Sequence, residues 1–168
     1  MGYVVDLRRI AGHPSYPMFT YTAICLPEWT DYNGHMNDAL YGRVFSNAVD
    51  AMLEEIGLTA EYRSKTKGTI YTVEDHRWYE AEVHEGATLR LETHILDSDV
   101  KRIHTWQGLY AGTQRCAVCE TMLLHITQAG DTPKTAPMPE TIQARLEEHK
   151  TEEALSPRSQ AIEIRRRA

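Results

Sequence analysis

The chain has 168 residues, 42% of them hydrophobic, and a formal net charge of −6 at pH 7. This length fits one domain with a sizeable core. The acidic charge argues against binding to nucleic acid, which needs a basic surface to neutralise phosphates. No apolar run approaches the length of a membrane-spanning helix, and the first residues carry too short an apolar segment for a secretory signal.

The three cysteines are an odd number, which fits a reducing cytoplasm when no secretory signal is present. Cys116 and Cys119 form a C-x-x-C motif, but no second Cys or His pair stands at zinc-like spacing. The motif also lies in an apolar run rather than at a helix start. We therefore expect two buried small side chains in a strand, and neither a metal nor a cofactor.

The predicted elements begin with a strand and a long helix. Residues 19–26 are rich in β-branched and aromatic residues and predict a strand, which Pro27 ends. From residue 38 to 57 apolar residues recur at helical spacing, and Gly57 is a suitable C-cap. The apolar surface of this helix is wide, which predicts that other structure wraps most of it.

Four more strands are predicted after the helix, with short turn signals between them. Such short connections favour antiparallel neighbours. A polar helix is expected between Pro139 and Ala154. The pattern predicts an α+β fold, in which one antiparallel sheet curls around one long central helix. We take residues 1–155 as a single domain and 156–168 as a charged C-terminal tail. The four strands are Thr69–Glu80, Thr88–Leu96, Lys101–Ala111 and Arg115–Ile126.

The stretch "TDYNGHMNDALYG", residues 30–42, lies between the first strand and the long helix. It contains the pattern D-x-x-G-H-x-N-x-x-x-Y, formed by Asp31, Gly34, His35, Asn37 and Tyr41. In this pattern and in the order of its elements, the chain resembles the hot-dog-fold thioesterases of the 4-hydroxybenzoyl-CoA thioesterase-like branch. The resemblance covers roughly Met18 to Ile126.

The resemblance implies a hot-dog fold and an acyl-CoA substrate that is hydrolysed without a cofactor. It implies that the Asp31 carboxylate is the nucleophile or general base. It also implies that the backbone N–H of Asp38 polarises the thioester carbonyl, since a helix N-terminus favours negative charge. His35 then orients Asp31, contacts the substrate or braces the loop, and bracing is the preferred role.

The same residues also have purely structural interpretations. Asp31 suits a turn or a helix N-cap, Asn37 suits the N-cap itself, and the Asp38 side chain complements the helix dipole. Gly34 would let the backbone approach a substrate closely. Tyr41 falls on the apolar stripe of the helix, where it belongs to the core or to the wall of a substrate pocket.

Longer stretches, among them "YTVEDHRWYEAEVHEGATL" and "KRIHTWQGLYAG", are similar to the thioesterases of bacterial carnitine degradation. Their assigned substrate is betainyl-CoA, and some are fused to carnitine dehydrogenase. No G-x-G-x-x-G motif is present, so we expect a stand-alone hydrolase. Aromatic faces bind quaternary ammonium groups, and Tyr79 is one of four aromatic residues near the motif or in the following strand. The expected substrate-binding residues are Gly34, Asn37, Tyr41, Trp29, Tyr32 and Trp78.

The resemblance further implies a homodimer or a dimer of dimers, with the site between subunits. Pairing would also cover the exposed edge of a single curled sheet. Two alternatives stay open. A hot-dog hydratase uses an Asp/His pair at a different spacing, and a non-catalytic acyl-CoA sensor should lack a carboxylate at the position of Asp31.

Overall fold

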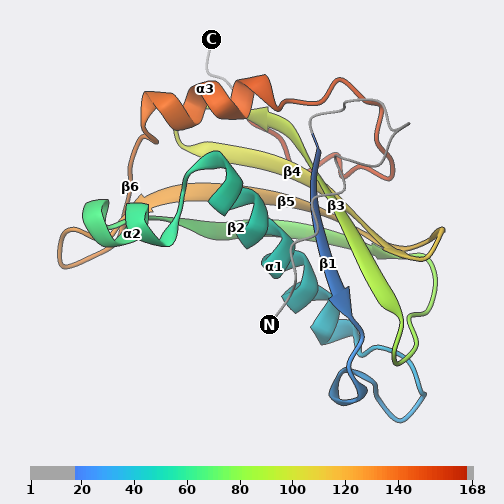
Figure 1. Cartoon of the computed structure of the whole chain (residues 1–168). Helices are drawn as coiled ribbons and strands as arrows, with labels where there is room; N and C mark the ends of the chain where they lie inside the picture. Colours follow the sequence, from blue (N-terminus) through green and yellow to red (C-terminus); the bar gives the residue numbers. More distant parts are fainter. Residues whose placement is uncertain (1–17, 166–168) are drawn as a thin grey trace.

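The computed structural model describes residues 18–165. One antiparallel sheet, with strand order β1-β3-β4-β5-β2 and a short β6 beside β5, is crossed by one long helix, α1 (Figure 1). The elements are β1 (Met18–Ile24), η2 (Pro27–Trp29), α1 (Asp38–Ile56), α2 (Ala60–Thr66), β2 (Gly68–Tyr79), β3 (Thr88–Ser98), β4 (Arg102–Ala111), β5 (Gln114–Thr127), β6 (Lys134–Thr135) and α3 (Glu140–Glu148).

Helix α1 is the central helix that the apolar spacing predicts. It ends at Ile56, and Gly57 caps it in the left-handed conformation with a φ of 99°, which glycine adopts without steric cost. Its apolar side packs on the sheet, and Arg43, Ser46 and Asp50 remain exposed on the other side. Its buried residues are Tyr41, Val44, Phe45, Ala48, Val49, Met52, Leu53 and Ile56.

The five long strands confirm the predicted order, with ends shifted by a few residues. Helix α2 was not predicted. It has seven residues and none of them is buried, so the sequence carries no apolar period there. Helix α3 is shorter than the range 139–154, because after it the backbone N–H of Thr151 bonds to the carbonyl of Ile95 in β3 at 2.8 Å.

The C-x-x-C motif lies in β5, as expected. Cys116 and Cys119 are buried and free, and so is Cys25. Burial raises the pKa of all three thiols. The prediction of buried small side chains in a strand is confirmed, because a protonated, enclosed thiol behaves as a small apolar group.

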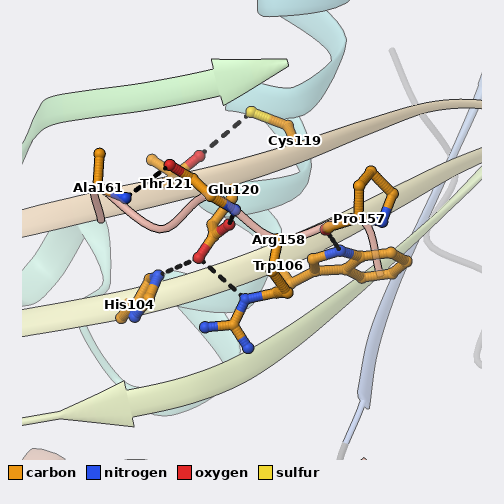
Figure 2. Close-up of polar contacts among 9 residues, drawn as sticks. His104, Trp106, Cys119, Glu120, Thr121, Pro157, Arg158 and Ala161 are labelled. Atoms are coloured by element: carbon orange, nitrogen blue, oxygen red, sulfur yellow. Dashed lines mark hydrogen bonds and ion pairs between the residues drawn. The ribbon is translucent and has the colours of Figure 1, made fainter. Parts of the chain in front are cut away.

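The C-terminal segment, residues 156–165, packs on the face of the sheet opposite α1 (Figure 2). The Trp106 indole N–H donates to the Pro157 carbonyl at 3.0 Å. Glu120, which has no exposed surface, accepts from the Arg158 guanidinium at 3.0 Å and from the backbone N–H of Ser159. The sequence indicated only a charged tail here. The separate tail from residue 156 stays a prediction, but its residues up to 165 are held against the sheet.

Candidate active site

The start of α1 is built by Asn37. This residue has extended backbone (φ −63°, ψ 140°), and its side-chain oxygen accepts the Ala39 N–H at 3.0 Å. Its expected role as the N-cap is confirmed. Within residues 18–165 the N–H of Asp38, the first helical residue, has no hydrogen-bond acceptor. An unpaired N–H at the positive end of a helix is a donor for a developing oxyanion.

The loop before α1 closes on itself around Asp31. The Asp31 N–H bonds to the His35 carbonyl at 2.9 Å, and the Gly34 N–H bonds to the Asp31 carbonyl at 3.0 Å. Gly34 has a φ of 80°, so glycine suits this turn. One carboxylate oxygen of Asp31 accepts the Asn33 N–H at 2.8 Å. In the described part of the chain the other oxygen has no hydrogen-bond partner.

His35 contacts the segment before β3 rather than the Asp31 carboxylate. Its Nε2 lies 3.3 Å from Oε2 of Glu82, and its ring meets the His84 ring edge to face at 5.4 Å. His84 in turn places Nδ1 3.3 Å from the Gly34 carbonyl. The Met36 N–H bonds to the Val83 carbonyl at 2.7 Å. These contacts match a bracing role for His35, and Glu82 is the partner that the sequence did not indicate.

Tyr41 lies in the hydrophobic core beside the helix start. It is 4% exposed, and burial raises its pKa to about 12, so its hydroxyl stays neutral. Its ring meets Tyr79 edge to face at 5.1 Å. The Tyr79 hydroxyl lies 3.5 Å from the Asp38 carbonyl oxygen, although the expected substrate-binding set did not include Tyr79.

The other three expected aromatic residues lie in different surroundings. Trp29 is 8% exposed in the core, and its carbonyl accepts the Asn37 N–H at 2.8 Å. Tyr32 is 97% exposed. Trp78 stacks on His76 at 4.2 Å. Since neighbouring residues of a strand face opposite sides and Tyr79 packs on α1, Trp78 points away from α1.

Two wider observations bear on the chemistry. Within residues 18–165, no three His, Cys, Asp or Glu side chains lie close enough to hold a metal ion. In the same range no helix is long and apolar enough to cross a membrane. The helix start itself presents the turn that carries the Asp31 carboxylate, followed by the unpaired N–H of Asp38.

The family model described as the thioesterase-like superfamily matches residues 25–146. The chain belongs to this superfamily. It is 41% identical over 135 residues to a betainyl-CoA thioesterase of Pseudomonas aeruginosa, with 79% of this chain and 84% of that protein covered. It is 36% identical over 124 residues, 74% of this chain, to an L-carnitine dehydrogenase/betainyl-CoA thioesterase of Ruegeria pomeroyi. The match covers 25% of the length of that two-part relative.

Two solved structures agree with this membership. A protein of Pseudomonas putida KT2440 assigned as a thioesterase is 32% identical, with a TM-score of 0.73 over 94% of this chain and 100% of that one. A Staphylococcus aureus protein solved in complex with CoA is 25% identical, with a TM-score of 0.77 over 89% and 96% of the two chains. The curled antiparallel sheet with its central helix is the hot-dog fold, and this thioesterase is a thioester hydrolase.

Proposed function

We propose that this thioesterase hydrolyses betainyl-CoA to betaine and CoA. The structural observation that carries the proposal is the free N–H of Asp38 beside the Asp31 turn, because thioester hydrolysis needs an oxyanion donor and a base or nucleophile. The substrate follows from the similarity to the Pseudomonas aeruginosa betainyl-CoA thioesterase. Carnitine degradation is the proposed setting, since a relative joins the activity to L-carnitine dehydrogenase.

In the proposed reaction the thioester carbonyl oxygen accepts a hydrogen bond from the Asp38 N–H, where the dipole of α1 stabilises the negative charge. Asp31 acts in one of two ways. As a nucleophile it attacks the carbonyl carbon and forms an anhydride that water then hydrolyses. As a base it removes a proton from the attacking water. In both routes the carbon–sulfur bond breaks and CoA leaves as a thiolate. The thiolate takes up a proton from Asp31 in the base route and from water in the nucleophile route, which gives free CoA thiol.

The test is hydrolysis of an acyl-CoA panel by wild type and Asp31→Asn, followed by the release of free thiol. Asparagine keeps an oxygen that accepts the Asn33 N–H, so the turn is preserved while the charge is removed. We expect the variant to lose about a hundredfold or more in kcat. Asp131→Asn makes the same change at an exposed residue of another loop and serves as the matched control.

Each result of this test has a clear meaning. Preferential cleavage of betainyl-CoA by wild type and a folded, inactive Asp31→Asn variant support the proposal. A fully active variant would show that Asp31 only shapes the turn. Binding of CoA esters without cleavage by either protein would favour the acyl-CoA sensor instead.

A homodimer, or a dimer of dimers, is part of the proposal. Strand β2 is an edge of the sheet, with one neighbour, β5. Val73 is 54% exposed on it, and long edges of this kind are usually covered by pairing. Light scattering on the purified protein should give at least twice the chain mass of 19.2 kDa. A monomer would contradict the proposal, and Val73→Lys should weaken the assembly.

A reducing compartment, the cytoplasm, also belongs to the proposal. Cys25, Cys116 and Cys119 are all free, whereas disulfides form and persist mainly in oxidising compartments. Fractionation of the source cells, with the thioesterase activity assayed in each fraction, tests this placement.

A further inference from the structure

We propose that the ring of Tyr79 binds the quaternary ammonium of the acyl group and so sets the preference of this thioesterase for a cationic substrate. This inference rests on the proposed function, because it assumes that the thioester carbonyl is held by the Asp38 N–H. It goes further by assigning the recognition of the acyl group to one residue and to the charge of the two loops around it.

The position of Tyr79 is the first observation. It is the last residue of β2, and its hydroxyl lies 3.5 Å from the carbonyl oxygen of Asp38. The perpendicular contact with buried Tyr41, 5.1 Å between ring centroids and 89° between planes, holds the ring against α1. Tyr79 is nevertheless 52% exposed. A fixed aromatic ring with an open surface thus stands beside the proposed oxyanion donor.

The length of the acyl group makes this position decisive. In a betainyl group one methylene joins the carbonyl carbon to the nitrogen, so the cation stays close to whatever holds the carbonyl. An aromatic face attracts a cation within about 6 Å of the ring centroid. Tyr79 contacts Asp38 at the helix start through its hydroxyl, whereas Trp78 points away from α1 and Trp29 is enclosed in the core.

Charge is the second, independent observation. The loop of residues 25–37 and the loop of residues 80–87 pack together, for example through the Cys25 N–H and the Ala87 carbonyl at 2.9 Å. Neither loop contains a lysine or an arginine. Both carry several carboxylates, with that of Asp38 beside them. We call these two loops the acidic rim. Its negative charge attracts a cation and repels an anion. The acidic residues of the two loops are Glu28, Asp31, Glu80, Glu82 and Glu85.

Two basic side chains, Arg77 on β2 itself and Arg115 on β5, are paired with carboxylates. Arg77, two residues before Tyr79, lies 2.6 Å from Oδ2 of Asp75. Arg115 bonds to both carboxylate oxygens of Glu80 at 2.7 and 2.8 Å. Each of these positive charges is therefore opposed by a neighbouring carboxylate. Because Glu80 is paired with Arg115, the negative charge of the two loops rests on Glu28, Asp31, Glu82 and Glu85.

The experiment compares two substrates that differ in one atom. Betainyl-CoA carries a trimethylammonium group, and tert-butylacetyl-CoA carries the same shape without the charge. The measured quantity is the ratio of kcat/KM for the charged substrate to kcat/KM for the neutral one. Because CoA is common to both substrates, this ratio isolates recognition of the cation.

The variants are Tyr79→Trp, Tyr79→Phe and Tyr79→Leu. We expect the ratio to be highest for Trp, similar for Tyr and Phe, and about tenfold lower than wild type for Leu, since cation binding follows the strength of the aromatic face. The neutral substrate checks in each variant that the catalytic apparatus is intact. Tyr71→Leu removes another half-exposed tyrosine from β2 and should leave the ratio unchanged.

The outcomes separate the inference from the function on which it rests. If wild type prefers betainyl-CoA and the ratio is the same in all three Tyr79 variants, the inference is overturned and the proposed function stands. If wild type cleaves tert-butylacetyl-CoA as well as or better than betainyl-CoA, both are overturned. A ratio that is highest for Tyr79→Trp and similar for wild type and Tyr79→Phe supports the inference. This comparison holds even if Tyr79→Leu fails to fold, because Trp and Phe keep an aromatic ring packed on Tyr41.

Discussion

His104 and Glu120 face each other from adjacent strands, β4 and β5, and both side chains are buried. Nε2 of His104 lies 2.8 Å from Oε1 of Glu120, and the two side chains are 4% and 0% exposed. The same carboxylate oxygen accepts from Arg158 of the C-terminal segment at 3.0 Å (Figure 2). A buried carboxylate with three donors therefore joins the end of the chain to the middle of the sheet.

Glu120→Gln should destabilise the protein by about 3 kcal/mol, because removing one partner of a buried charge network leaves the others unpaired. Urea unfolding, followed by circular dichroism, measures this loss. Glu163→Gln is the control in the same segment, since Glu163 pairs with Arg165 on the surface and should cost less than about 0.5 kcal/mol. Equal effects of the two substitutions would contradict a central role for Glu120.

Stability should fall as the pH is lowered from 8 to 5. Burial lowers the pKa of His104 and of His94 below the ordinary value of 6.5, although Glu120 opposes the shift at His104. The unfolded chain then binds more protons than the folded one, so the stability present above pH 6.5 is lost as pH falls toward the folded pKa values. His104→Gln should make the unfolding midpoint less dependent on pH. An unchanged pH dependence in this variant would exclude His104 as its source.

Asn37→Ala should lower stability by about 1 kcal/mol through loss of the N-cap. Asn37→Ser keeps an oxygen that can accept the Ala39 N–H and should restore most of the loss. Thermal unfolding of the three proteins measures this, and thiol release measures activity in parallel. If the serine variant is stable but inactive, Asn37 also contacts the substrate, as the resemblance to the hot-dog thioesterases implies.

All three cysteines should be unreactive in the folded protein. Cys25, Cys116 and Cys119 are 0%, 1% and 2% exposed, and burial keeps their thiols protonated. A chromogenic disulfide reagent should therefore label none of them in native buffer and all of them in guanidinium. Rapid labelling of a native thiol would show that β5 or the chain after β1 opens readily.

Much of the helix start could be predicted from the sequence, because its signals are local. The spacing of apolar residues from Tyr41 to Ile56 set the face of α1, and Asn37 stands where a capping side chain is needed. The turn around Asp31 and Gly34 likewise depends on residues within five positions of each other. Short-range hydrogen bonds and helical periodicity involve residues close together in the chain, so they can be recognised in the sequence.

The role of β2 was harder to predict. Most of its residues are exposed, so its alternation does not show which side faces the helix, and its pairing shifts register between Thr72 and Glu74. Trp78 is in the expected substrate-binding set because it is an aromatic residue of the strand after the helix. The structure places its neighbour Tyr79 against α1. The tertiary contacts of Tyr79 with Tyr41 and Asp38 distinguish the two neighbours.

By itself, the sequence determined the order of the elements, the limits and cap of the central helix and the turn that carries Asp31, since each depends on neighbours along the chain. The tertiary structure alone decided which aromatic ring stands beside Asp38, which segment braces His35 and where residues 156–165 rest. These contacts join residues tens of positions apart, such as Glu120 and Arg158. Their formation depends on how the sheet curls, which no local pattern encodes.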